Sequence, residues 1–208
     1  MYECSKANMR RLRDSRFASR YFVGNGIDIG AGEDPLEMYR ELFPGMKSCR
    51  AWDWHHGDGQ MLTTVPDASM DFVHSSHSLE HLEDPREALA NWIRVLKPGG
   101  HLVIIVPDED LYEQGVFPST FNPDHKWTFT VAKKDSWSPR SLNVTELASA
   151  FSHRLQVVKI ELLDATFLYD VGRSDQTMTP IGESGIELIM RKWTPGELKA
   201  KGRFPGVG

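Results

Sequence analysis

Residues 26–35 read GIDIGAGEDP, and this stretch decides the fold of the chain. A short apolar segment runs into the glycine turn at residues 30–32 and then into the helix-like sequence DPLEMYRELF. A strand, a glycine turn and a helix start in this order let the backbone approach a nucleotide-like ligand. The dinucleotide fingerprint needs a third glycine where this chain has Pro35, so the loop is not built for a pyrophosphate. Asp28, two residues before the first glycine, suits a ligand that carries an amino group.

Length and composition are those of one globular domain. The chain has 208 residues, of which 40% are hydrophobic and 25% are charged, and its formal net charge is -5. The negative charge argues against a general nucleic-acid surface, and no apolar run approaches the roughly 18 residues that cross a bilayer. Cys4 and Cys49 give no disulfide framework and fit a reducing compartment. We therefore expect a cytoplasmic protein without a nucleic-acid or membrane partner.

Strand and helix patterns alternate along the chain, which predicts an α/β fold with a doubly wound sheet. Strands are expected at about 26–29, 48–52, 71–75, 101–106, 156–163 and 186–192, and helices at 35–42, 77–96 and 143–150. Residues 107–139 lack periodicity and are rich in aromatic, proline and acidic residues, which is typical of a functional loop. The predicted organisation is an N-terminal helical arm at 1–23, one domain at 24–193 with a substrate or lid insertion at 107–139, and a flexible tail at 194–208.

Three motifs in sequence resemble those of the class I S-adenosylmethionine-dependent methyltransferases, in particular the small type 11 group. GIDIGAGEDP is similar to the first motif of that family, and DFVHSSHSLEHLEDP (71–85) is similar to its fourth-strand motif. NWIRVLKPGGHLVIIVP (91–107) matches the helix, turn and fifth strand that follow. The resemblance covers about residues 24–107 strongly and the remainder weakly. It implies a Rossmann-like, mostly parallel sheet of seven strands, the last of them antiparallel.

The resemblance also implies a cofactor, S-adenosylmethionine, and a product, S-adenosylhomocysteine. Asp28 would bind the amino group of the cofactor, directly or through water. Asp53, at the end of the second strand, would hold both ribose hydroxyls, because a carboxylate accepts two hydrogen bonds at once. The other implied cofactor residues are Gly30, Ala31 and Gly32 under the methionine part, Asp58 at the adenine amino group, Gly59 and Gln60 along the adenine ring, and Ser75 and Ser76 at the methionine end.

One departure from the family lies between Asp53 and Asp58, where only WHHG intervenes. The family usually has a helix and a third strand there. The third strand is an edge strand in this fold, so shortening it removes little of the core. The shortening opens the adenine side of the pocket, and it leaves open which of the two acids takes which role.

Two histidines are candidate catalytic residues. His77 follows the fourth-strand motif, near the place where a methyl group would be transferred, and the alternative is a role in loop structure or exposure to solvent. His125 lies in the aromatic loop, where the family places residues that bind the methyl acceptor. A neutral imidazole there can take the proton from a hydroxyl or amine, because its pKa lies near working pH.

The residues HSLEH (77–81) also match H-x-x-E-H, a zinc-peptidase pattern in which two histidines bind the metal and Glu80 is the base. No helix-borne third ligand follows, and the flanking motifs match a methyltransferase, so we expect no metal. The predicted function is methyl transfer from S-adenosylmethionine to a small-molecule acceptor, with a saccharide or natural-product intermediate as the first expectation by family analogy. The oligomeric state is expected to be a monomer or homodimer. A binding module without catalysis and a zinc hydrolase remain the alternatives.

Overall fold

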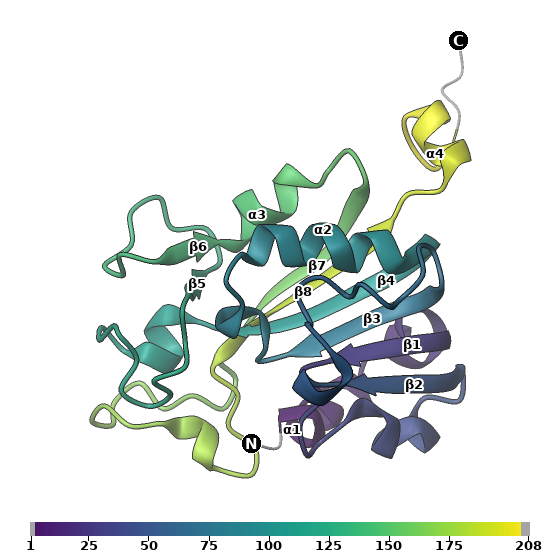
Figure 1. Ribbon diagram of the computed structural model, residues 1–208. Helices are drawn as coiled ribbons and strands as arrows, with labels where there is room; N and C mark the ends of the chain where they lie inside the picture. Colours follow the sequence, from purple (N-terminus) through teal and green to yellow (C-terminus); the bar gives the residue numbers. More distant parts are fainter. Residues whose placement is uncertain (1–2, 205–208) are drawn as a thin grey trace.

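The computed structural model describes residues 3–204, which build helical layers on both faces of a central sheet (Figure 1). The sheet has six strands, which are β1 (Gly24–Ile29), β2 (Met46–Trp52), β3 (Met70–Ser76), β4 (Leu96–Pro107), β7 (Leu155–Leu163) and β8 (Gly185–Lys192). Their spatial order is β2-β1-β3-β4-β8-β7. The pairs among β1 to β4 are parallel, and β8 is antiparallel to both of its neighbours. The predicted doubly wound, mostly parallel sheet with an antiparallel last strand is confirmed.

The predicted count of seven strands is wrong, because the central sheet has six strands. Among the described residues, no strand lies between β2 and β3, where residues 53–69 form turns and one short 3₁₀ turn, Trp54–His56. The connection is short and rich in glycine, proline and aspartate, so it supplies no apolar run that could pair along the outer edge of β2. β2 is therefore the edge of the sheet, and the region next to Asp53 is open.

Side chains of successive strand residues point to opposite faces of the sheet, and each face has its own apolar cluster. The face that carries Val73 and Ile104 is covered by α2 (Pro85–Val95) and α3 (Val144–Ala150). The opposite face carries Phe72 and Val103 and packs against Cys4 of α1 (Glu3–Arg11) and the helical turn Phe17–Tyr21. The N-terminal residues are therefore part of the core on that face.

α2 begins at Pro85, eight residues after the predicted start. Asp84 caps the helix, since its side chain accepts hydrogen bonds from two backbone N–H groups of the first turn, and Pro85 fits the first helical position. Upstream, Leu79–His81 forms a separate 3₁₀ turn, and His77 has a φ of 52°. The zinc-peptidase pattern requires both histidines on one face of an α-helix. His77 and His81 do not meet this requirement.

The remaining elements lie outside the central sheet. Within 107–139 the chain forms a helical turn, Glu109–Glu113, and β5 (Thr128–Thr130), which pairs in parallel with β6 (Ser141–Asn143). α4 (Pro195–Ala200) stands away from the body in Figure 1. It lies in the segment predicted as a tail, where a capping box formed by Thr194 and Glu197 starts the helix. Residues 1–2 of the predicted arm and 205–208 of the predicted tail lie outside the described residues.

None of the helices within residues 3–204 combines the length and apolar character that crossing a membrane requires.

Candidate cofactor and acceptor site

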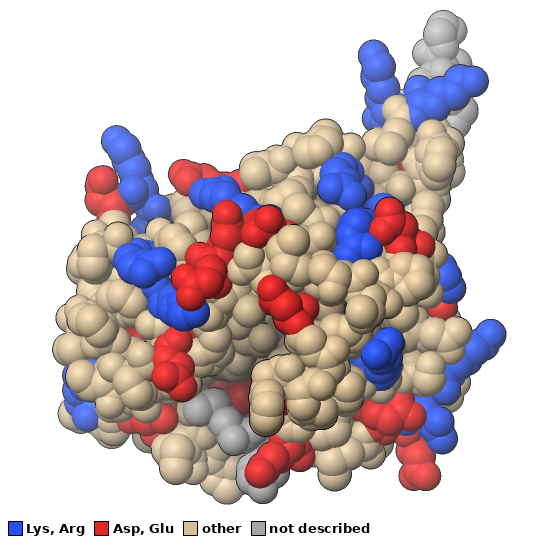
Figure 2. Space-filling view, viewed as in Figure 1, with Lys and Arg blue, Asp and Glu red and all other residues tan. Residues whose placement is uncertain are grey.

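Two adjoining cavities lie at the carboxyl ends of the parallel strands, where ligands bind in open α/β sheets. The first cavity, on the side of α1 and residues 107–125, has a volume of about 220 Å³. The second cavity lies on the side of β2 and is lined by Asp53. Both cavities are lined by Gly30, His77 and His81, so they adjoin at these residues. Figure 2 shows this face hollowed near its centre, with acidic atoms visible inside the hollow.

The glycine turn separates the two cavities and needs its glycines for different reasons. Gly30 has a φ of 72°, and a Cβ built on it would lie 2.4 Å from the side chain of Ser78. Gly32 has a φ of 54°, but nothing lies within 4 Å of a Cβ at that position. Gly30 therefore allows both a left-handed backbone and a close approach, whereas Gly32 allows the backbone conformation alone.

Replacement of the two glycines should separate these effects. Gly30→Ala should lower the free energy of unfolding by more than about 2 kcal/mol, because overpacking adds to the cost of a left-handed backbone. Gly32→Ala should cost about 1 kcal/mol, the conformational cost alone. Urea denaturation of the two variants measures both values, and equal losses would contradict the close approach of Gly30 to Ser78.

Asp53 lies directly after β2 and faces the glycine turn. One carboxylate oxygen, Oδ2, accepts a hydrogen bond from the backbone N–H of Gly32 at 3.0 Å, and Oδ1 accepts one from Trp54 at 2.7 Å. Trp54 lines the second cavity and is 86% exposed. An acid and an exposed indole thus lie side by side at the open edge of the sheet.

Three of the implied cofactor residues, Asp58, Gln60 and Ser75, line neither cavity. Asp58 accepts a hydrogen bond from the backbone N–H of Gln60 at 2.7 Å, and the Gln60 amide donates to Glu87. Ser75 is completely buried. The other implied cofactor residues line the two cavities. The first cavity is lined by Asp28, Gly30, Ala31, Gly32 and Ser76, and the second by Gly30, Asp53 and Gly59.

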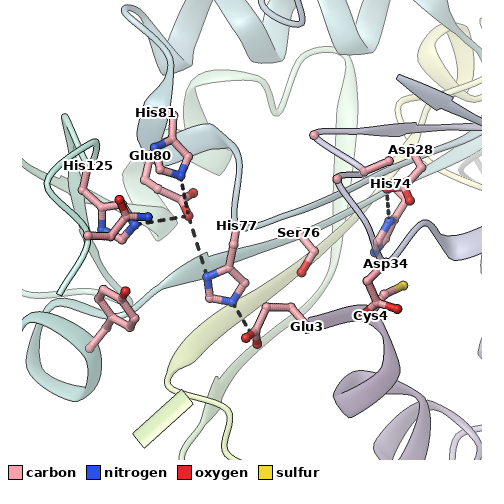
Figure 3. Close-up of a pocket in the computed structure, with 15 residues that line it drawn as sticks. Glu3, Cys4, Asp28, Asp34, His74, Ser76, His77, Glu80, His81 and His125 are labelled. Atoms are coloured by element: carbon pink, nitrogen blue, oxygen red, sulfur yellow. Dashed lines mark hydrogen bonds and ion pairs between the residues drawn. The ribbon is translucent and has the colours of Figure 1, made fainter. Parts of the chain in front are cut away.

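Asp28 is buried beneath the glycine turn, and both of its carboxylate oxygens bind protein groups. Oδ2 accepts the backbone N–H of Leu36 at 2.8 Å, and Oδ1 lies 2.6 Å from Nδ1 of His74. The other ring nitrogen of His74 lies 3.0 Å from Nη2 of Arg11. Because Arg11 can only donate, Nε2 of His74 accepts and Nδ1 carries the proton that it donates to Asp28. This chain of buried groups joins β1 to β3 and α1, and Figure 3 shows its Asp28–His74 contact.

Three imidazoles surround the carboxylate of Glu80 on the other side of the first cavity (Figure 3). Oε1 of Glu80 lies 3.7 Å from Nδ1 of His77 and 3.9 Å from Nε2 of both His81 and His125. These separations are too long for hydrogen bonds. Glu80 is completely buried, and neither of its side-chain oxygens has a hydrogen-bond partner among the described residues.

The segment that carries His125 is fixed onto the segment that carries Glu80. The backbone N–H groups of Lys126 and Trp127 both donate to the carbonyl of Glu80, at 2.8 and 3.2 Å. The indole N–H of Trp127 donates to the carbonyl of Leu82 at 3.1 Å. Both predicted catalytic histidines, His77 and His125, therefore line the first cavity at defined positions.

Burial sets the protonation of the groups at the centre of this cluster. Burial raises the pKa of Glu80 to about 7. Burial also lowers the pKa of His77 to about 3, with a further contribution from the nearby His125. His77 is therefore a neutral imidazole at physiological pH.

The raised pKa of Glu80 predicts a pH dependence of stability. The native state keeps a proton on Glu80 up to about pH 7, whereas the unfolded chain loses it near pH 4.5. Unfolding therefore releases a proton between these values, so rising pH favours the unfolded state. In buffer with a chelator, the wild type should lose up to about 3 kcal/mol of unfolding free energy over this interval relative to Glu80→Gln.

Urea denaturation at several pH values checks this difference. The titratable groups that face Glu80 are present in both proteins, and they are His77, His81, His125, Glu3 and Glu113. The low pKa of His77 has the opposite effect, because unfolding takes up a proton below about pH 6.5, but it acts in both proteins. Parallel stability curves for the two proteins would contradict the burial of an unpartnered carboxyl.

Several residues of the first cavity were missed by the sequence prediction. Glu3 and Cys4 enter from α1, and Tyr112 and Asn122 enter from the 107–139 segment. Oε2 of Glu3 lies 3.7 Å from Nε2 of His77. No local sequence pattern indicates these residues, because they reach the site through the packing of distant segments.

Comparison with known proteins gives a family match over part of the chain. Residues 16–104 match the family model described as a methyltransferase domain. These residues include β1, the glycine turn, Asp53 and the HSLEH segment. This match, over less than half of the chain, supports a class I S-adenosylmethionine-dependent methyltransferase. The fold of the chain is similar to that of a SAM-dependent methyltransferase from Archaeoglobus fulgidus, with a TM-score of 0.57 at 20% identity, over 92% of this chain and 95% of that one.

Two curated proteins are similar to this chain in sequence. A demethylmenaquinone methyltransferase of Renibacterium salmoninarum is 26% identical over 186 residues, which are 88% of this chain and 73% of that protein. An uncharacterized 37.1 kDa protein of transposon TN4556 from Streptomyces fradiae is 48% identical over 89 residues. That match covers 42% of this chain and 24% of the length of that relative.

Proposed function

We propose that this methyltransferase binds S-adenosylmethionine across the two cavities and transfers its methyl group to a small polar acceptor in the first cavity. The observation that carries the proposal is the arrangement of the glycine turn, Asp53 and the acceptor-side histidines around adjoining cavities at the carboxyl ends of β1 to β4. The family match supports the choice of cofactor.

The adenosine half is assigned to the second cavity. A carboxylate that accepts two hydrogen bonds suits a ribose diol, and Asp53 is the acid that lines this cavity. The exposed indole of Trp54 beside it offers a flat surface on which adenine can stack. Asp58 lies outside both cavities, so we assign the ribose role to Asp53 and not to Asp58.

The methionine half is assigned to the glycine turn and the first cavity. Ser76 lines this cavity, and its hydroxyl oxygen is buried without a hydrogen-bond partner among the described residues. An unpartnered hydroxyl suits the amino or carboxylate group of the cofactor. Asp28 contributes negative charge beneath the turn, while its oxygens hold Leu36 and His74.

The acceptor is assigned to the region around His77 and His125. Methyl transfer is an in-line displacement on a carbon that the sulfonium already activates, so the protein mainly aligns the acceptor and excludes water. A neutral His77 can accept a hydrogen bond from a hydroxyl acceptor and orient it, although its low pKa makes it a weak base. The polar lining favours a hydroxyl-bearing small molecule, such as a saccharide or a natural-product intermediate, and the Renibacterium relative adds quinols to the candidates.

The test measures formation of S-adenosylhomocysteine in the presence of sugars, nucleotide sugars, phenols and quinols. Activity with one acceptor class, lost in Asp53→Ala and reduced in His77→Ala, is the expected result. Binding of S-adenosylhomocysteine without turnover on any acceptor class would contradict catalysis and favour a binding module.

A further inference from the structure

We propose that Glu80, His81 and His125 bind a divalent transition-metal ion on the acceptor side of the first cavity. The side-chain ligand atoms of these three residues all lie within 4.8 Å of one another. Two imidazole nitrogens and one carboxylate oxygen are a common ligand set for zinc and for non-haem iron(II). This set differs from the zinc-peptidase pattern, because Glu80 is a ligand and His125 comes from a distant segment. The proposal replaces the expectation of no metal.

The hydrogen bonds of the two histidines leave their Nε2 atoms as acceptors. Nδ1 of His81 lies 3.1 Å from the carbonyl oxygen of Asp124, and Nδ1 of His125 lies 2.7 Å from Oε1 of Glu113. Both partners accept hydrogen bonds, so each Nδ1 carries a proton. In a neutral ring the lone pair is then on Nε2, which faces Glu80 in both cases. Metal-binding histidines are held in this way by a carboxylate or carbonyl behind the ring.

The carboxylate of Glu80 supplies the second, independent observation. It is completely buried, and neither oxygen has a hydrogen-bond partner among residues 3–204. Two imidazole lone pairs and a carboxyl group without hydrogen-bond partners therefore converge. Buried polar groups without partners are costly, and a bound cation satisfies all three acceptors at once.

The two separations from Glu80 come close to the spacing that such an ion needs. Ligands about 2.1 Å from a tetrahedral ion lie about 3.4 Å apart, so each 3.9 Å separation from Glu80 needs to close by about 0.5 Å. His81 is partly exposed, so its ring can make this adjustment. Tyr112 packs against the His125 ring with the ring centroids 5.0 Å apart, and it holds that ring in place.

An ion at this position would be a Lewis acid for the methyl acceptor, a consequence that rests on the proposed methyl transfer. Three protein ligands leave a coordination position open toward the cavity. An acceptor hydroxyl that binds there releases its proton to solvent. Its oxygen then forms a bond to the methyl carbon, and the carbon–sulfur bond breaks with its electron pair on sulfur to give S-adenosylhomocysteine. The acceptor class implied is an alcohol or phenol.

Cobalt(II) titration of the chelator-treated full-length protein, followed by visible absorption, tests the site without S-adenosylmethionine. We expect one ion per chain with absorption bands of a four- or five-coordinate site, and displacement by zinc. Glu80→Gln and His125→Ala should each weaken binding at least about 100-fold. Glu113→Gln, which loosens the hold on His125, should weaken it about 10-fold.

A matched control removes the exposed pair His55 and His56, whose ring centroids lie 3.9 Å apart and which line neither cavity. Their double alanine variant should bind cobalt as the wild type does. Thermal melting verifies that Glu80→Gln, which preserves side-chain shape, remains folded. Absence of stoichiometric binding, or binding lost in the His55/His56 variant and kept in Glu80→Gln, would overturn the proposal. A direct measurement of cofactor affinity in the same samples distinguishes this failure from failure of the proposed function.

Discussion

An Asp53→Ala variant should bind S-adenosylmethionine at least about 100-fold more weakly than the wild type. Two charge-assisted hydrogen bonds to a ribose diol are together worth about 3 kcal/mol or more, and a factor of 100 in affinity corresponds to about 2.8 kcal/mol. The substitution also removes the acceptors for the N–H groups of Gly32 and Trp54, so the turn loses an anchor. Titration calorimetry with S-adenosylmethionine and S-adenosylhomocysteine measures the change.

Asp58→Ala is the matched control for this experiment. Both acids lie in the connection that follows β2, but Asp58 lines neither cavity, and its carboxylate caps a local turn at Gln60. Its replacement should change the affinity less than about threefold, or less than about 0.7 kcal/mol. Normal binding by Asp53→Ala together with a collapse in Asp58→Ala would reverse the assignment of the two acids.

An Asp28→Ala variant should lose about 3–5 kcal/mol of unfolding free energy, because it leaves two buried donors without an acceptor at a cost of about 1–3 kcal/mol each. The side chains of Asp28 and His74 are 3% and 1% exposed, and the loss leaves His74 and the N–H of Leu36 without their acceptor. For a chain of this size the melting temperature should fall by about 10 °C. Denaturation in the absence of cofactor is the measurement, so that ligand binding does not contribute.

A double-mutant cycle with His74→Ala separates this structural role from a cofactor role. Because the two side chains act as one unit, the double variant should be little less stable than Asp28→Ala alone. If Asp28→Ala kept the stability of the wild type and lost cofactor affinity alone, the structural role of the Asp28–His74 pair would be refuted.

The parts of the fold that the sequence predicted are those set by local pattern. β1, the glycine turn and the acid at the end of β2 follow each other within 30 residues and carry their own signals. The start of α2 was predicted at 77 although Asp84-Pro85 is a strong start signal, because the apolar period upstream looked continuous. The helix at 195–200 was missed although Thr194 and Glu197 have capping-box spacing.

The composition of the acceptor side could not be predicted from local pattern. His125 meets Glu80 because two backbone N–H groups of the 107–139 segment donate to the Glu80 carbonyl, a contact over more than 40 residues. Glu3 arrives from the first helix in the same way. The sequence singled out His77 and His125 separately, and it contained Glu80 within HSLEH. Only the fold shows that both histidines lie beside the carboxyl group of Glu80.

Calorimetric titration of the folded protein with S-adenosylhomocysteine tests the central claim most directly, because product binding requires neither an acceptor nor a metal ion. We expect saturable binding of one molecule per chain, weakened at least about 100-fold by Asp53→Ala and preserved in Asp58→Ala and Glu80→Gln. The contradictory result is a folded wild type that binds neither S-adenosylhomocysteine nor S-adenosylmethionine.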